Sequence, residues 1–165
     1  MKHLVVFISL ALTFSAGTRA ALCQSSETDK ITISHQLDEL HKMASEANFE
    51  GYFALYHDRA VFLGTDATER WPVDEFKSYT RQRFEQGTGW TYVMTSRNIF
   101  VSSDGNTAWF DELLENENLG LTRGTGVLLK EDGKWLFSQY NLTIPVPNDL
   151  ARDLVSRIRA IEETG

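Results

Sequence analysis

Residues 107–148 of the 165-residue chain read TAWFDELLENENLGLTRGTGVLLKEDGKWLFSQYNLTIPVPN. Apolar and polar side chains alternate in three runs separated by turn-forming residues, which is the pattern of antiparallel strands. Asp132-Gly133 is a two-residue hairpin signal, because such a turn needs positive φ. Pro145 and Pro147 end the last run, since proline donates no hydrogen bond to a sheet. The stretch therefore predicts a curved meander of strands that can wall a pocket.

The flanking sequence adds a further strand and several helices. The period of two begins at Trp90, and Asp104-Gly105 predicts a hairpin between strands at about 90–102 and 106–115. Apolar residues follow helical spacing at 33–47, 49–56 and 76–84, and a short strand is expected at 60–63. Residues 149–165 form a C-terminal amphipathic helix. The fold class is α+β, with N-terminal helices packed on a strongly curved antiparallel sheet.

The N-terminus has the layout of an export signal. A basic start at Lys2 and His3 precedes an apolar run and small residues up to Ala20. We expect a signal peptide at 1–20, a flexible polar leader at 21–31 and a domain at 32–148, hence a periplasmic or secreted protein. Alternatives are a buried first helix, or lipidation at Cys23, which Leu22 disfavours because a small residue is expected there.

Charge and motifs narrow the partners. The net charge is −7; residues 1–20 carry two basic residues and no acid, so cleavage would leave 14 − 23 = −9. Nucleic acid is disfavoured as a partner, as is a membrane unless Cys23 is lipidated, because both attract basic faces. His35 and His41 do not share a helix face as metal ligands would. No metal or cofactor is expected.

Turn positions predict which side chains meet across the strands. Asn98 is expected opposite Asp111, Asp111 opposite Arg123, and Thr125 opposite Tyr140. Around Asn98, Asp111 and Arg123, one face would collect Tyr92, Met94, Phe100, Trp109, Val127, Leu136 and Tyr140. Apolar walls with a few polar groups are typical of a small-molecule site. The alternative is a buried Asp111–Arg123 pair with a structural role only.

The opposite face is also apolar. It would carry the Arg97–Glu112 pair among Val93, Ile99, Val101, Phe110, Leu128, Trp135 and Phe137. Such a face avoids water, so it predicts a homodimer through a sheet face, or cover by the final helix. The pocket and the dimer surface can be exchanged between the two sheet faces, because the alternation of side chains is compatible with either assignment.

Two further residues are candidates for the cavity. His57 would lie near its mouth, where a histidine can move protons near neutral pH, although surface histidines are more common. Trp71, with Glu69, would line the cavity or pack in the core. The predicted ligand-binding residues are Tyr92, Asn98, Trp109, Asp111, Arg123, His57 and Trp71. The predicted catalytic residues are Asp111, Arg123 and Tyr140.

Several short segments together resemble a known family. They are VFLGTD at 61–66, Glu69 with Trp71, AWFDE at 108–112, RGTGVL at 123–128, DGKW at 132–135 and PVPN at 145–148. In this order they resemble the SnoaL-like proteins of the nuclear transport factor 2-like superfamily. The resemblance implies a cone-shaped roll with a pocket between helices and sheet, usually in a dimer. Its members include isomerases, dehydratases, cyclases and hydrolases of small apolar molecules, and non-catalytic assembly domains.

Two positions depart from the pattern of relatives. Ketosteroid isomerase-like members carry a general-base aspartate at the end of the first strand, where this chain has Gly64, with Asp66 two residues later. Many SnoaL-like relatives have histidines on the last strand, where this chain has Gln139 and Asn141.

Three functions follow as hypotheses. The first is a secreted module that binds a small, partly apolar ligand. The second is a cofactor-independent lyase or isomerase with Asp111 as base, Arg123 holding charge, and Tyr140 or Tyr92 stabilising an oxyanion. The third is a dimeric assembly domain working through a sheet face.

Overall fold

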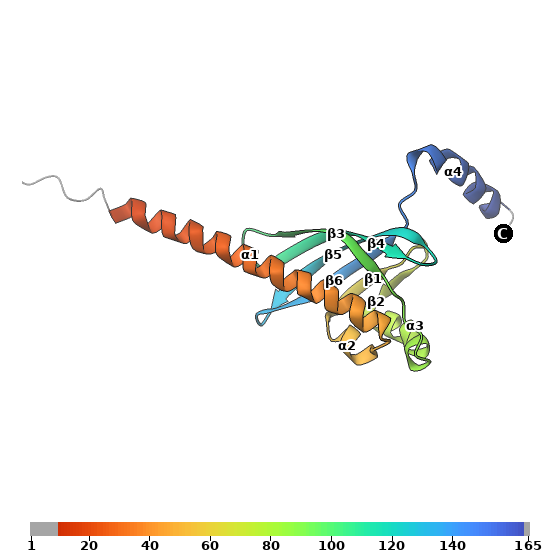
Figure 1. The fold of residues 1–165 in the computed structure, drawn as a ribbon, viewed down its shortest axis with the longest axis horizontal. Helices are drawn as coiled ribbons and strands as arrows, with labels where there is room; N and C mark the ends of the chain where they lie inside the picture. Colours follow the sequence, from red (N-terminus) through yellow and green to blue (C-terminus); the bar gives the residue numbers. More distant parts are fainter. Residues whose placement is uncertain (1–9, 164–165) are drawn as a thin grey trace, which may run out of the picture.

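The computed structural model describes the backbone of residues 10–163 and side chains from residue 26. Six strands form one sheet, β1 (Tyr56–Leu63), β2 (Arg70–Pro72), β3 (Val93–Val101), β4 (Thr107–Asn116), β5 (Gly120–Glu131) and β6 (Lys134–Thr143). The helices are α1 (Leu10–Ser45), α2 (Phe49–Phe53), α3 (Val73–Glu85) and α4 (Asn148–Glu162). Helices α1, α2 and α3 lie on the same side of the sheet (Figure 1). The α+β cone expected from the sequence is confirmed.

The sheet is mixed rather than purely antiparallel. Its strand order is β2-β1-β6-β5-β4-β3, and β1 runs parallel to β6 while the other neighbours are antiparallel. The hairpins confirm the turn predictions, since Gly105 has a φ of 71°, and Asp132 and Gly133 have φ values of 49° and 77°. The short β2, helix α3 and strands β3–β5 separate β1 from β6 along the chain, which gives the chain the length to cross to the parallel partner.

The inner face of the sheet packs beneath α1. Its buried residues include Phe110 and Leu114 of β4, Leu128 of β5, and Trp135 and Phe137 of β6. From α1, Ile33, Leu37, Leu40 and Ala44 repeat at helical spacing and are also buried. This inner face is the one we assigned to a dimer or to the final helix. The two face assignments are exchanged in the structure, because α1 supplies the cover.

The predicted flexible leader is wrong for residues 26–31. These residues continue α1, and Asp29 is buried at the sheet end. Its Oδ1 accepts from Lys130 Nζ at 2.8 Å and from Trp135 Nε1 at 3.1 Å. These contacts hold a segment whose polar composition indicated mobility. Residues 1–9 and the side chain of Cys23 lie outside the described parts, so cleavage and lipidation stay predictions.

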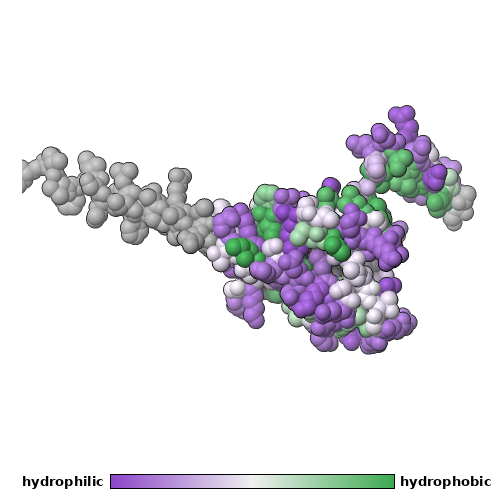
Figure 2. All heavy atoms as spheres, viewed as in Figure 1, coloured by the Kyte–Doolittle hydropathy of each residue, from purple (hydrophilic) through white to green (hydrophobic). Residues whose placement is uncertain are grey.

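Helix α4 stands apart from the sheet (Figure 1), and none of its described residues is buried. Apolar residues gather along it (Figure 2), among them Leu154 and Ile158. The alternative in which this helix covers a sheet face is therefore not observed. Within the described part of the chain, no helix is both long and apolar enough to cross a membrane.

Candidate functional site

A pocket of about 160 Å³ lies between α1, α3 and the inner face of the sheet. Its walls are mainly aromatic and aliphatic, including Leu40, Phe76 and Trp90. The pocket opens to solvent beside Tyr79 and Leu119, whose side chains are exposed. A mainly apolar cavity with a few polar groups has the character of a small-molecule site.

Near-parallel rings form one side of the pocket. The Phe62 ring stacks on Phe76 at a centroid distance of 4.0 Å and an interplanar angle of 12°. The Phe62 ring also stacks with Tyr140, at a centroid distance of 5.8 Å and an interplanar angle of 4°, and with Trp71, at 6.0 Å and 18°. A flat ring can extend this stack with offset geometry. The wall therefore favours a planar ligand.

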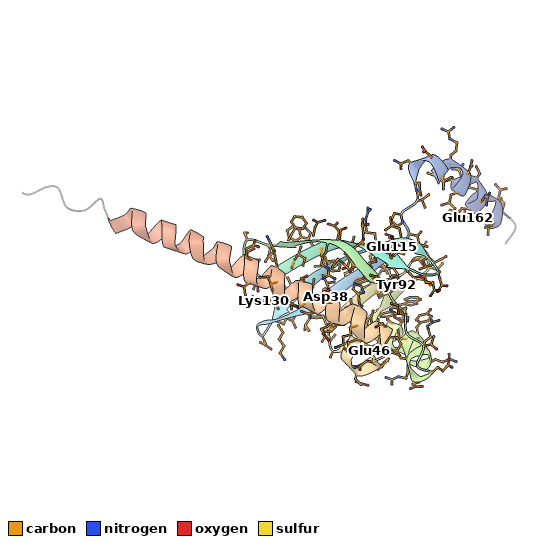
Figure 3. All side chains as sticks on the ribbon, in the orientation of Figure 1. Asp38, Glu46, Tyr92, Glu115, Lys130 and Glu162 are labelled. Carbon is orange, nitrogen blue, oxygen red and sulfur yellow. The ribbon has the colours of Figure 1, made fainter. Side chains whose placement is uncertain are left out.

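A buried carboxylate lies behind the pocket wall. The Glu112 side chain on β4 is fully buried, and Arg97 Nε on β3 donates to its Oε2 at 2.9 Å. Arg97 Nη2 lies 2.8 Å from the same oxygen but is not directed for a hydrogen bond. Arg97 Nη1 donates to Asp38 Oδ1 and to the Ser34 carbonyl of α1. Arg97 thus compensates the buried charge and ties β3 and β4 to α1 (Asp38 in Figure 3).

His41 connects this carboxylate to the pocket. It lines the pocket from α1, and its Nε2 lies 2.8 Å from Glu112 Oε1. Because an ionised carboxylate can only accept, this contact places the imidazole proton on Nε2. The lone pair of the neutral ring is then on Nδ1. A histidine oriented by a carboxylate in this way can bind a polar ligand group or accept a proton.

Two tyrosines add hydroxyl groups to the site. Tyr140 donates to Glu112 Oε1 at 3.3 Å, and burial, followed by the charge of Glu112, raises the pKa of Tyr140 well above its ordinary value. Tyr92 lies just before β3 (labelled in Figure 3), where burial and then the charge of Glu69 raise its pKa. Both side chains therefore stay protonated phenols at neutral pH.

The end of β1 contributes a second carboxylate. Gly64 and Glu69 both line the pocket, and a Cβ at position 64 would lie 2.1 Å from Glu69 Oε2. The Glu69 carboxylate thus occupies the space into which a side chain at Gly64 would extend. The same oxygen accepts from the Asp66 amide at 3.2 Å. The pocket therefore has an acid at this corner, although the strand residue itself is glycine.

Three of the predicted site residues lie together in the pocket, Tyr92, Trp71 and Tyr140. Asn98, Asp111, Arg123 and Trp109 belong to the opposite phase of β3, β4 and β5 and do not line it. Asn98 donates to Asp111 as the predicted pairing implies, at 3.1 Å. The predicted pairing of Asp111 with Arg123 is wrong, because Asp111 is opposite Thr125.

His57 is placed away from the pocket mouth. It is buried, its Nε2 lies 2.9 Å from Glu131 Oε1, and its Nδ1 accepts from the Arg59 amide. Both ring nitrogens are therefore engaged, and the contact of Nε2 with Glu131 joins β1 to the end of β5. This arrangement corrects the surface or cavity position that we expected.

His41 and Glu112 are missing from the predicted site, although the sequence carries a signal for both. His41 lies four residues after Leu37 and three before Ala44, beside the buried stripe of α1. Glu112 alternates with Phe110 and Leu114, so it shares their inward phase on β4. A polar residue such as Glu112 on the apolar side of a strand, together with a histidine on the apolar side of a helix, indicates a buried polar pair.

The fold is that of the cone-shaped, nuclear transport factor 2-like class. Residues 33–147 match the model of the SnoaL-like domain, so the chain belongs to the SnoaL-like family. No curated protein matches the chain.

Solved structures with the same fold are distant in sequence. A nuclear transport factor 2-like protein of unknown function from Pseudomonas putida KT2440 has a TM-score of 0.64 and 13% identity over 75% of this chain and 92% of its own. A candidate dehydratase of the same family from Streptomyces avermitilis has a TM-score of 0.64 and 12% identity, covering 73% and 99%. A candidate scytalone dehydratase from Novosphingobium aromaticivorans DSM 12444 has a TM-score of 0.62 and 13% identity, covering 75% and 89%. At these identities the similarity concerns the fold.

Proposed function

We propose that the protein binds a small, neutral, planar molecule in the pocket beneath α1. The observation that carries the proposal is a mainly aromatic cavity of about 160 Å³ with His41 in its wall. A cavity of about 150 Å³ holds one benzene ring. The pocket is therefore suited to a single substituted ring or a small fused ring system, with a polar substituent near His41.

The charge of the pocket favours a neutral ligand. Glu69 lines the cavity and Glu112 lies behind its wall. Arg97, the cation beside Glu112, is buried and already contacts Glu112 and Asp38. An anionic ligand would meet the Glu69 carboxylate in a poorly solvated space, which is unfavourable. A neutral carbonyl, amide or hydroxyl group avoids this cost.

Benzamide and benzoate test this preference, because they match in shape and differ in charge. We expect benzamide to bind at least about fivefold more tightly than benzoate at neutral pH, because one nearby like charge costs about 1 kcal/mol or more. Titrations followed by calorimetry measure both affinities, and Asp111→Asn serves as a control outside the pocket. Equal affinities, or preference for benzoate, would contradict the assigned charge; binding by neither compound would count against the ligand site.

We further propose that the outer sheet face pairs with a second copy of the chain. Phe100 and Trp109 stack there at 5.8 Å, and each is 46% exposed. The face also holds Asp111 and the exposed Arg123, which are not opposite each other in the sheet. A two-fold contact can set Asp111 of one copy opposite Arg123 of the other, and the reverse, because such an interface is self-complementary.

Light scattering after gel filtration tests the pairing. The unaltered chain is expected to have twice the monomer mass, and Trp109→Asp the monomer mass, because an unpaired charge would be buried in the contact. His57→Gln, outside both surfaces, should keep the dimer mass. A monomer mass for the unaltered chain at tens of micromolar would refute this interface.

A further inference from the structure

We propose that the pocket catalyses proton transfer, with His41 accepting a proton from a carbon of the bound molecule and Tyr92 donating a hydrogen bond to the oxygen that gains negative charge. The inference rests on the proposed function, because the molecule must first bind in the pocket. It assigns the chemistry to residues other than Asp111 and Arg123, which lie on the other sheet face.

The contacts of His41 prepare it to act as a base. Glu112 Oε1 lies 2.8 Å from Nε2, so the neutral ring carries its proton there and its lone pair on Nδ1. When Nδ1 takes a proton, the imidazolium is stabilised by the carboxylate beside it. Only 12% of the His41 side chain is exposed, which limits competition from water. His41 is the catalytic base, and Glu112 is a positioning residue.

Arg97 makes this arrangement stable before a ligand binds. Its guanidinium contacts Glu112 Oε2 and leaves Oε1 for His41 and Tyr140. A buried carboxylate without such a cation would be costly in free energy. The two oxygens of Glu112 therefore have separate partners, one holding the charge and the other orienting the base.

Tyr92 is the tyrosine available to the ligand. The Tyr140 hydroxyl already donates to Glu112. Among the described residues, no hydrogen bond of the Tyr92 hydroxyl is present, and the ring lies 6.4 Å from His41 between centroids. Burial raises the pKa of Tyr92, so the phenol keeps the proton it would donate. A phenol directed at a developing oxyanion lowers the barrier to its formation.

The reaction class needs no additional reactant. Removal of a proton from the carbon next to a carbonyl leaves its electron pair in an enolate, whose oxygen receives the Tyr92 hydrogen bond. Where the enolate is conjugated with a double bond, return of the proton from His41 to the far carbon of that bond gives an isomer. Where the neighbouring carbon carries a hydroxyl group, the enolate expels it; the leaving hydroxide takes the proton from His41 and departs as water, and an unsaturated carbonyl compound remains. Substrates are therefore small, neutral, ring-containing carbonyl compounds with an acidic C–H bond.

5-Nitrobenzisoxazole is a suitable probe because it is planar, neutral and reports proton removal by colour. A base takes the proton on the ring carbon, the electron pair of that bond forms the nitrile, and the N–O bond breaks to give a coloured phenolate. We expect turnover above buffer that falls about 100-fold in His41→Gln, since general bases contribute about 10²–10⁴-fold. Competition with benzamide should show that His41→Gln still binds the probe. Free imidazole should partly restore turnover to His41→Ala.

Steady-state kinetics separate the positioning role of Glu112 from a purely structural one. Glu112→Gln should lower kcat with little change in KM, because the imidazolium formed by proton transfer has lost its carboxylate neighbour, whereas a loss of packing would also weaken binding. Other charged or titratable groups near His41 are Tyr92, Tyr140, Glu69 and Arg97, with Asp38 on the same helix. Glu112→Asp should recover part of the turnover if Glu112→Gln folds poorly.

Two matched variants complete the test. Asp111→Asn, on the outer face, should leave turnover unchanged, and Tyr92→Phe should lower kcat with little change in KM. Probe binding without His41-dependent turnover, or turnover lost in Glu69→Gln and kept in His41→Gln, would overturn the inference while the binding proposal stands. Failure of the probe and of benzamide to bind would overturn both.

Discussion

Arg97→Met lowers the free energy of unfolding by about 3–5 kcal/mol, because it leaves the buried Glu112 carboxylate without its cation. The Arg97 side chain is 5% exposed and that of Glu112 is fully buried. Water therefore cannot replace the lost guanidinium. The substitution also removes the hydrogen bonds to Ser34 and Asp38 of α1. Denaturation by urea, followed by circular dichroism, measures the change.

A double variant distinguishes lost charge compensation from lost packing. Arg97→Met combined with Glu112→Met should recover much of the stability, because no uncompensated charge remains. Asp38→Asn is the matched control. The Asp38 side chain is 55% exposed, so this substitution should change the free energy of unfolding by about 1 kcal/mol or less. A loss below about 1 kcal/mol for Arg97→Met alone would contradict the buried-charge interpretation.

Phe76→Ala is the second substitution with a large expected effect. The residue is 1% exposed, stacks on Phe62 at 4.0 Å and contacts Tyr52 edge-on at 6.2 Å. Truncation of a buried phenylalanine costs about 3–5 kcal/mol through lost burial and the cavity that remains. Because Phe76 also lines the pocket, the same change enlarges the binding space. Stability should therefore fall while affinity for a two-ring amide rises relative to benzamide.

Tyr79→Ala on the same helix is the control. Its side chain is 49% exposed, so stability should change by about 1 kcal/mol or less. Chemical denaturation and calorimetric titration with benzamide and 2-naphthamide give both quantities. An unchanged ratio of the two affinities in a folded Phe76→Ala would show that Phe76 does not bound the ligand site.

Local turn chemistry made the pairing of the first hairpin and the turn of the last one predictable, but the expected pairing of Thr125 with Tyr140 is wrong, because Thr125 lies opposite Asn141. The Asp104-Gly105 turn correctly placed Asn98 opposite Asp111 and Arg97 opposite Glu112. The middle hairpin was less regular. Asn116 Oδ1 accepts from the Asn118 and Leu119 amides, and Gly120 takes a φ of 67°. These bonds move the turn by one residue and the pairing by two, which replaces Arg123 by Thr125 opposite Asp111.

The position of Tyr140 depended on an irregularity that periodicity does not reveal. The β5–β6 register shifts between Val127 and Leu128, so both Phe137 and Tyr140 of β6 are buried on the inner face. Strict alternation sends them to opposite faces. Tyr140 was therefore a correct pocket residue assigned to the wrong face. A bulge of this kind is set by packing along both strands rather than by a local motif.

The choice between the two faces depended on tertiary contacts. Both faces are apolar, so composition alone could not decide which one α1 covers. The residues that decide it are spread over three elements: Leu40 of α1, Phe76 of α3 and Phe110 of β4 are all buried. Likewise, the His41–Glu112 contact joins positions 71 residues apart. A contact between residues so far apart in the sequence depends on which sheet face α1 covers, and the alternation of side chains does not determine that face.

The most direct test of the ligand site is the set of nuclear Overhauser effects between bound benzamide and the aromatic protons of the protein. The pocket predicts contacts with Phe76 and Trp90, which line it. Contacts with Phe100 and Trp109, the stacked pair of the outer face, would contradict the central claim.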